Sequence, residues 1–188
     1  MALSYLTNWK FANEKVMGRM EEGVEMLKWK PPCLGRVKLN AYAAFDEGNN
    51  VMGLGWVLRD DDGRFLAAKR MCVLGKYEVK EAKAVCVREA LSWMKGTSIG
   101  DVDAETDLQL VYYALCSDSF NSVFGFIIDD VKDVASMIDG VDFYFVKRST
   151  NRASHTVARE VVSMSSCGQW FDDPPLYLVD CFLSDLTN

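Results

Sequence analysis

The chain has 188 residues, of which 49% are hydrophobic and 12% aromatic, and this is enough for one packed domain with extensions. Its six cysteines form no C-x-x-C pair and it has a single histidine, so a zinc cluster is not expected. The net charge of −6 argues mildly against strong non-specific binding to nucleic acid, although it allows a local basic face.

The N-terminal segment carries apolar residues at three- and four-residue spacing from Met17 to Leu27. This spacing predicts an amphipathic helix within residues 1–30, which packs on the domain or on a protein partner; a weakly ordered lead-in is the alternative. The segment lacks the layout of a signal peptide. No part of the chain contains an apolar run of about 18 residues, the length that a membrane span needs. We therefore expect a cytoplasmic or nuclear protein with no membrane contact.

Three strands are predicted next, over residues 36–45, 51–59 and 64–74. Short polar turns join them, and the second turn, Asp-Asp-Asp-Gly at residues 60–63, is a strong hairpin signal. Strands that follow one another through such short turns pair side by side. The pattern therefore predicts an antiparallel meander.

Helices and strands then alternate, and the predicted order of all elements is β-β-β-α-β-α-α-β-α. The later elements are helices over 78–95, 107–116, 122–138 and 152–166, with strands over 102–106 and 141–148. This order predicts an α/β fold with a mixed five-stranded sheet, three antiparallel strands followed by two further strands, and helices on both faces. We divide the chain into a lead-in and linker (1–32), the domain (33–168) and an extended C-terminal tail that packs on the domain (169–188).

Several segments, taken together, resemble plant retroelement-type ribonuclease H domains of the reverse-transcriptase-associated superfamily, over roughly residues 29–185. The segments that carry the resemblance are PPCLGRVKLNAYAAFDE, GLGWVLRDDDGRFLAA, EAKAVCVREALSWMK, VDAETDLQLVYYAL, FVKRSTNRASHTVARE and WFDDPPLYLVDCFLSD. The resemblance implies a ribonuclease H-like fold. It also implies descent from enzymes that cut the RNA strand of an RNA–DNA hybrid with two magnesium ions.

Four positions hold the metals in that family: an Asp on the first strand, a Glu on the first helix, an Asp after the fourth strand, and an Asp or His on the last helix. In this chain the matching residues are Tyr42, Lys83, Asp107 and His155. The resemblance therefore retains Asp107 and His155 as catalytic positions, while Tyr42 and Lys83 are substitutions.

The substitutions predict that magnesium binds weakly or not at all, with Asp107 as its one remaining carboxylate. At about 4 Å and an effective dielectric constant of about 20, a Lys ammonium and a magnesium ion repel by about 8 kcal/mol. Nearby carboxylates at Asp46, Glu81 and Glu105 are offset along their strand or around their helix and do not obviously restore a metal cage. We therefore expect no metal cofactor and a loss of hydrolysis.

Each of the four residues also has a simpler interpretation. Asp107 precedes an apolar run and could cap the helix that follows. Lys83 could pair with Asp107 or extend to solvent, His155 could be a surface residue of its helix, and Tyr42 could fill the core. The sequence leaves these alternatives open.

A basic cluster at the end of the last strand could still bind phosphates. Its members are Lys147, Arg148 and Arg152, with Arg159 one or two turns further on, and Asn40 could reach a sugar or base edge. A solvated charged surface is the alternative. Three functions follow: a ribonuclease H-like domain that binds RNA–DNA hybrids without cutting them, an active hybrid ribonuclease, or a protein-interaction domain that keeps only the fold.

Overall fold

A computed structural model describes residues 28–186, apart from 47, 96, 98, 118–120 and 165 and the side chains of 162–164 and 186. The helix expected within residues 1–30 therefore lies almost wholly outside the described residues. The segment 28–32 has no regular secondary structure and leads directly to the first strand.

A single mixed sheet forms the centre of the molecule, and its strands lie in the order β5-β4-β1-β2-β3-β6. The strands are β1 (Val37–Asp46), β2 (Val51–Arg59), β3 (Phe65–Leu74), β4 (Val102–Thr106), β5 (Val141–Phe145) and β6 (Gly168–Phe171). The first three are antiparallel, as predicted; β4 and β5 extend the sheet in parallel from β1, and β6 is antiparallel to β3. The mixed α/β architecture is confirmed, with one strand more than predicted.

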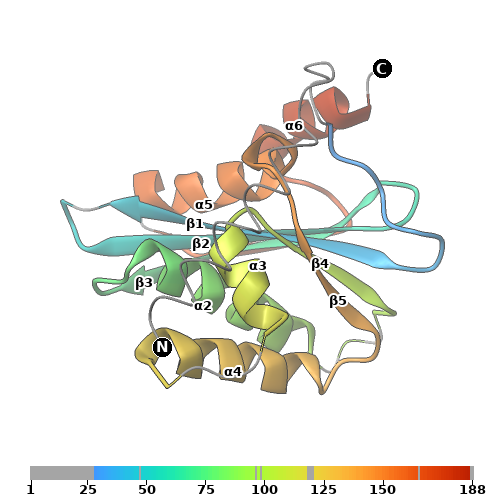
Figure 1. Ribbon diagram of the computed structural model, residues 1–188. Coiled ribbons are helices and arrows are strands. Elements are labelled where there is room, and N and C mark those ends of the chain that lie inside the picture. The colour runs from blue at the N-terminus through green and yellow to red at the C-terminus, as the bar shows by residue number, and fades with distance from the viewer. Residues whose placement is uncertain are drawn as a thin grey trace, which may run out of the picture.

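Helices cover both faces of this sheet, which confirms the prediction of a covered sheet. They are α2 (Val79–Met94), α3 (Gln109–Leu115), α4 (Val123–Ala135), α5 (Arg152–Met164) and α6 (Leu176–Leu186), with a short 3-10 helix η1 (Arg148–Thr150) before α5. Figure 1 shows α5 and α6 on one face and α2, α3 and α4 on the other. Because both faces are covered, the first eight residues of β1 are buried without alternation.

The C-terminal tail differs from the extended segment that we expected. It forms β6, which pairs with the edge of β3, and then α6, whose Leu178 and Cys181 are buried in a cluster with Val57. The two prolines of the tail, at 174 and 175, stand just before the helix, where a missing backbone N–H costs no helical hydrogen bond. They start α6 and do not prevent it.

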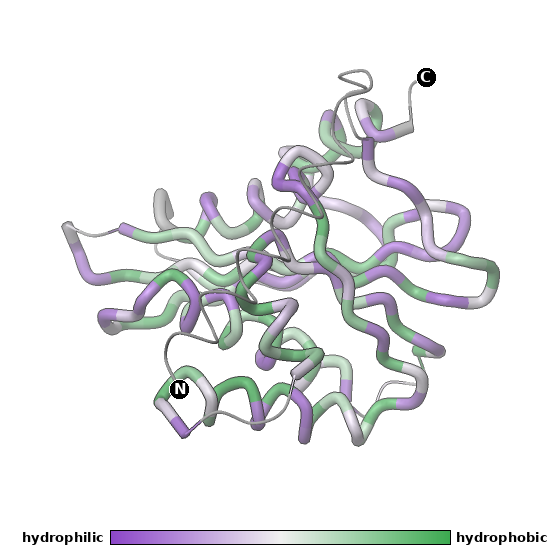
Figure 2. Tube along the Cα trace, in the orientation of Figure 1, coloured by the Kyte–Doolittle hydropathy of each residue, from purple (hydrophilic) through white to green (hydrophobic). Residues whose placement is uncertain are grey.

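Hydrophobic residues fill the space between sheet and helices. Trp56, Leu54 and Leu39 of the sheet and Leu91 of α2 are fully buried in one cluster. Helix α4, which Figure 2 shows with both hydrophobic and hydrophilic residues, buries Gly125, Ile128, Val131 and Ala135 at three- and four-residue spacing, as expected of a helix with one face on a core. This packing holds α2 firmly against the sheet.

Helix α5 lies unusually close to the sheet because β2 carries glycine at position 55. A β-carbon there would collide with the backbone of Ala158. Tyr42 of β1 is the register partner of Gly55, so the close approach of α5 brings its side chains next to Tyr42. Any larger residue at position 55 would push α5 away from the sheet.

A buried arginine joins the two ends of the described chain. Arg59 of β2 is 2% exposed and binds the Asp185 carboxylate of α6 at 2.8 Å. Its guanidinium carbon lies 3.3 Å from the centroid of the Trp29 ring and 5.2 Å from that of Phe182. The charge is thus balanced by one carboxylate and faced by two aromatic rings.

Candidate functional site

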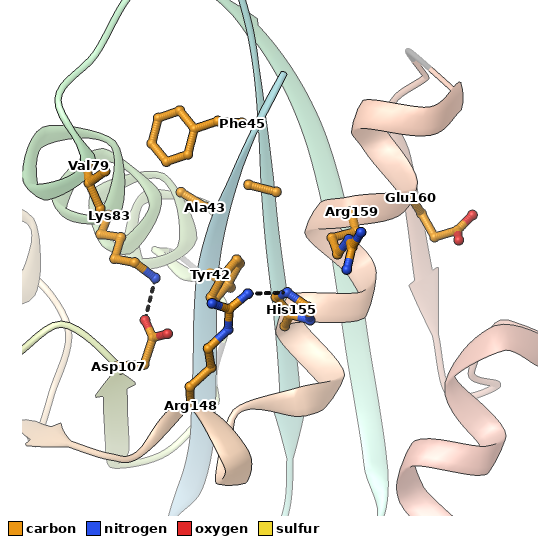
Figure 3. A pocket seen from close by; sticks show the side chains of 11 residues that line it. Tyr42, Ala43, Phe45, Val79, Lys83, Asp107, Arg148, His155, Arg159 and Glu160 are labelled. Atoms are coloured by element: carbon orange, nitrogen blue, oxygen red, sulfur yellow. Dashed lines mark hydrogen bonds and ion pairs between the residues drawn. The ribbon is translucent and has the colours of Figure 1, made fainter. Parts of the chain in front are cut away.

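A groove of about 940 Å³ opens between β1, the start of α2 and α5, and we call it the site groove. Its lining residues are Tyr42, Ala43, Ala44, Phe45, Val79, Lys83, Asp107, Arg148, His155, Arg159 and Glu160. Figure 3 shows the central side chains. The four positions singled out by the family resemblance come from four separate elements, and the structure brings them together here.

Lys83 and Asp107 form an ion pair across the groove (Figure 3). The pair is nearly dry, because the two side chains are only 9% and 5% exposed. The Lys83 ammonium also lies 3.7 Å from the centroid of the Tyr42 ring, over its face. The predicted pairing of Lys83 with Asp107 is therefore present, and Tyr42 adds a cation–π contact to it.

Burial changes the proton affinities of both groups that face Asp107. It lowers the pKa of Lys83, while the Asp107 charge and hydrogen bond act in the opposite direction and favour the ammonium form. Burial raises the pKa of Tyr42, which keeps this side chain a neutral phenol. The centre of the site therefore consists of one cation, one anion and a neutral ring.

Asp107 does not cap the helix that follows it, in contrast to one of our interpretations. Helix α3 begins at Gln109, its N-cap residue is Leu108, and no side chain caps it. The Asp107 carboxylate is directed instead to Lys83. From its position directly after β4, Asp107 therefore places its carboxylate in the site groove.

His155 belongs to the same cluster and is not an isolated surface residue. Its ring meets the Tyr42 ring edge-on, with centroids 4.6 Å apart, and its Nε2 lies 2.8 Å from a guanidinium nitrogen of Arg148. An arginine can only donate, so the His155 Nε2 accepts and the imidazole is neutral in this arrangement. Partial burial, followed by the charges of Arg148 and Arg159, lowers the pKa of His155.

Because His155 is the single histidine of the chain, its titration can be followed directly by NMR. We expect a midpoint below the ordinary value of 6.5, and a higher midpoint in Arg148→Gln. As the pH falls, the unfolded chain, whose imidazole has the higher pKa, is protonated before the folded chain. The free energy of unfolding is therefore unaffected by His155 above about pH 6.5, and it decreases as the pH falls from there towards the folded-state pKa. Arg152→Gln is the control, because Arg152 binds Ser184 and not the imidazole. Equal midpoints in all three proteins would contradict the assignment.

The residues of the groove do not fit a pair of magnesium ions. Asp107 is held by an ammonium, and the described residues contain no group of three or more His, Cys, Asp or Glu side chains placed to hold a metal. Magnesium prefers several carboxylate oxygens in octahedral geometry, and one already neutralised carboxylate does not provide them. Glu160 lines the groove, but its carboxylate points away from the pair (Figure 3).

The other candidate carboxylates are engaged elsewhere. Asp46 accepts hydrogen bonds from Asn49 in the β1–β2 turn. Glu81 completes a capping box with Glu78 at the start of α2. Glu105 is buried and binds Lys38 and Asn40. None of the three lines the site groove.

The predicted nucleic-acid contacts lie in three different environments. Arg148 lines the site groove, while Lys147 and Arg152 are exposed on either side of η1. Asn40 is 1% exposed and its amide is used internally, since it accepts from the Trp29 indole at 2.9 Å and donates to Glu105 at 2.6 Å. Contrary to our expectation, the Asn40 side chain is therefore not presented to a ligand.

Comparisons with known proteins agree with this architecture. The sequence model of the family described as reverse transcriptase-like matches residues 40–161. No curated protein matches the chain.

Among the described residues, no helix combines the length and the apolar character needed to cross a membrane.

Solved ribonuclease H structures are similar to the chain over about two thirds of its length. Ribonuclease H1 from Halobacterium salinarum is 22% identical with a TM-score of 0.62, and the match covers 68% of this chain and 98% of that one. The N-terminal ribonuclease H domain of a Mycobacterium tuberculosis protein is 15% identical with a TM-score of 0.60, and the match covers 68% of this chain and 94% of that one. LC11-RNase H1 in complex with an RNA/DNA hybrid is 13% identical with a TM-score of 0.57, and the match covers 69% of this chain and 97% of that one. At these identities the likeness shows a shared fold.

Proposed function

Because the chain belongs to the reverse transcriptase-like family and has a ribonuclease H-like fold, we propose that it binds RNA–DNA hybrids without hydrolysing them. The observation that carries this proposal is the buried ion pair between Lys83 and Asp107. LC11-RNase H1, whose fold is similar to that of this chain, has been crystallised in complex with an RNA/DNA hybrid, which supports the ligand class that we propose.

The ion pair argues against two-metal hydrolysis on electrostatic grounds. Lys83 already neutralises Asp107, and its ammonium repels any divalent cation that approaches the same oxygens. Tyr42 fills the space between Lys83 and His155 with an uncharged ring. Binding a metal would require the separation of a dry ion pair, which costs several kcal/mol.

The same substitutions favour the binding of a phosphate backbone. Three cationic side chains line the groove, Lys83, Arg148 and Arg159, against the two carboxylates of Asp107 and Glu160. The described lining residues of the groove therefore carry a net charge of about +1, with His155 neutral. A groove with this balance attracts phosphates without the help of metal ions.

Binding that does not depend on metal is the first test of this proposal. In fluorescence anisotropy, a labelled RNA–DNA hybrid should bind equally well in magnesium and in excess chelator. Arg148→Glu should weaken binding about tenfold or more, because it replaces a phosphate contact by a repulsive charge. Lys95→Glu, with the same charge change on an exposed residue at the end of α2, is the matched control.

Cleavage of the same hybrid distinguishes the proposal from an active ribonuclease. We expect no product in magnesium or manganese. Product that requires magnesium and disappears in Asp107→Asn would overturn the proposal. A protein-interaction role that keeps only the fold, through residues 1–30, predicts instead no affinity for the hybrid even at low salt.

The plant retroelement ancestry implied by the sequence segments belongs to the same proposal, as does the cytoplasmic or nuclear location expected from the sequence.

A further inference from the structure

A second cavity, of about 400 Å³, lies beside the site groove, and we call it the lysine pocket. It is formed by the segment before β1, by β1 itself, by the end of β4 and by the connection from β5 to α5. Its lining residues are Lys28, Trp29, Lys30, Lys38, Glu105, Phe145, Val146, Lys147 and Thr150. Four lysines in one cavity indicate an anionic ligand.

A buried lysine forms part of the pocket wall. Lys38 is 8% exposed, and its ammonium is fixed by the Glu105 carboxylate at 2.7 Å and by the Lys30 carbonyl oxygen at 2.7 Å. Asn40 donates to the other oxygen of Glu105 at 2.6 Å. The ammonium also lies 5.5 Å from the centroid of the Trp29 ring, so Lys38 is held firmly in the pocket wall.

The rim of the pocket carries exposed lysines. Lys30 and Lys147 are exposed, whereas Glu105, the one carboxylate among the described lining residues, is already paired with Lys38. Phe145 is 40% exposed and presents an aromatic surface beside these cations. Lysines together with an exposed ring are typical of sites that hold the phosphate and the base of a nucleic-acid strand.

The lysine pocket and the site groove are neighbours. Lys147 lines the pocket and the next residue, Arg148, lines the groove. Across the cavity wall, Glu105 lines the pocket and Asp107, two residues later, lines the groove. Consecutive residues lie about 3.8 Å apart, so one strand of nucleic acid can reach both cavities.

We propose that the lysine pocket is a second phosphate subsite, which holds a phosphodiester of the strand that lies in the site groove while Phe145 contacts the adjacent base. This inference rests on the proposed function and extends it to a binding path that includes the segment 28–30. The ligand is recognised through its phosphate, and its sequence is not read.

The test uses the full chain with the double substitution Lys28→Gln/Lys30→Gln, which changes two exposed side chains and leaves the buried Lys38 in place. We expect hybrid affinity to fall about three- to tenfold and the slope of log affinity against log salt to decrease in magnitude by about 1, as for the loss of one phosphate contact. Lys95→Gln/Lys132→Gln removes the same charge from α4 and the end of α2 and should change neither quantity.

A second measurement separates the pocket from the groove. In NMR spectra of the wild-type chain, 5′-phosphorylated trithymidylate should shift the amides of Phe145, Lys147 and Thr150, and the double variant should lose these shifts. If the hybrid does not bind but the trinucleotide shifts are present, the proposed function fails and the pocket stands. If the hybrid binds, while the lysine variant matches its control and the amides do not shift, the pocket proposal is overturned and the proposed function stands.

Discussion

The double variant Tyr42→Asp/Lys83→Glu is expected to gain magnesium-dependent cleavage of RNA–DNA hybrids. It exchanges the ammonium and the ring that surround Asp107 for two carboxylates, so that three acidic side chains and His155 converge in the site groove. Electrostatic contributions of this kind are commonly worth a factor of about 100 to 1,000 each, so the gain over wild type should be at least about a hundredfold. The measurement is product formation from a hybrid labelled on its RNA strand.

The control for this gain is the same double variant with Asp107→Asn, which should lose the new activity. Folding must be checked separately, because Tyr42 is a buried residue and its replacement removes apolar contacts. If the folded double variant binds magnesium, its melting temperature should rise with magnesium concentration. A variant that is folded, binds magnesium and still does not cut would show that the groove no longer presents a hybrid to the metal position.

The substitution Lys83→Met is expected to lower the free energy of unfolding by about 3–5 kcal/mol, the usual cost of removing one partner of a buried ion pair. Methionine fills a similar volume, but it leaves the Asp107 carboxylate, only 5% exposed, without its counter-charge. Urea unfolding followed by fluorescence measures the loss.

Two further variants show whether burial is the cause of this loss. Lys80→Met, on the same helix, removes an ion pair with Glu78 at the protein surface and should change the unfolding midpoint little. Lys83→Met/Asp107→Leu replaces both charges with apolar groups and should recover most of the stability that the single variant loses. A full loss in this double variant would mean that packing, and not charge, explains the effect.

Local patterns were sufficient to predict most of the fold. The second and fourth strands begin and end where the hydrophobic pattern and the turn residues place them, at 51–59 and 102–106. The tail was not predictable in this way, because β6 forms by pairing with an edge strand about 100 residues earlier, and α6 is stabilised by its packing against Val57 and its ion pair with Arg59 on β2, and by contacts with α5. The sequence of the tail itself contains no pattern that indicates either the pairing of β6 with β3 or the packing of α6 on the domain.

For the site, too, some features could be predicted from the sequence and others could not. The spacing of the family segments places Lys83 near Asp107, and opposite charges in a shared groove then pair. The use of Asn40 was not foreseen, because its partners Trp29 and Glu105 become neighbours only when the segment before β1 folds onto the sheet. The lysine pocket was missed for the same reason, since Lys147 is far in the sequence from Lys28, Lys30 and Lys38 and joins them only in the folded chain.

Arg59 has a practical consequence for anyone who shortens this chain. The family match covers residues 40–161, and a fragment cut at those bounds would keep Arg59 but discard Trp29, Phe182 and Asp185. Such a fragment would carry a bare cation in its interior together with an uncovered apolar surface on β2, which favours insolubility. The shortest fragment that keeps this arginine both covered and neutralised runs from residue 29 to residue 185.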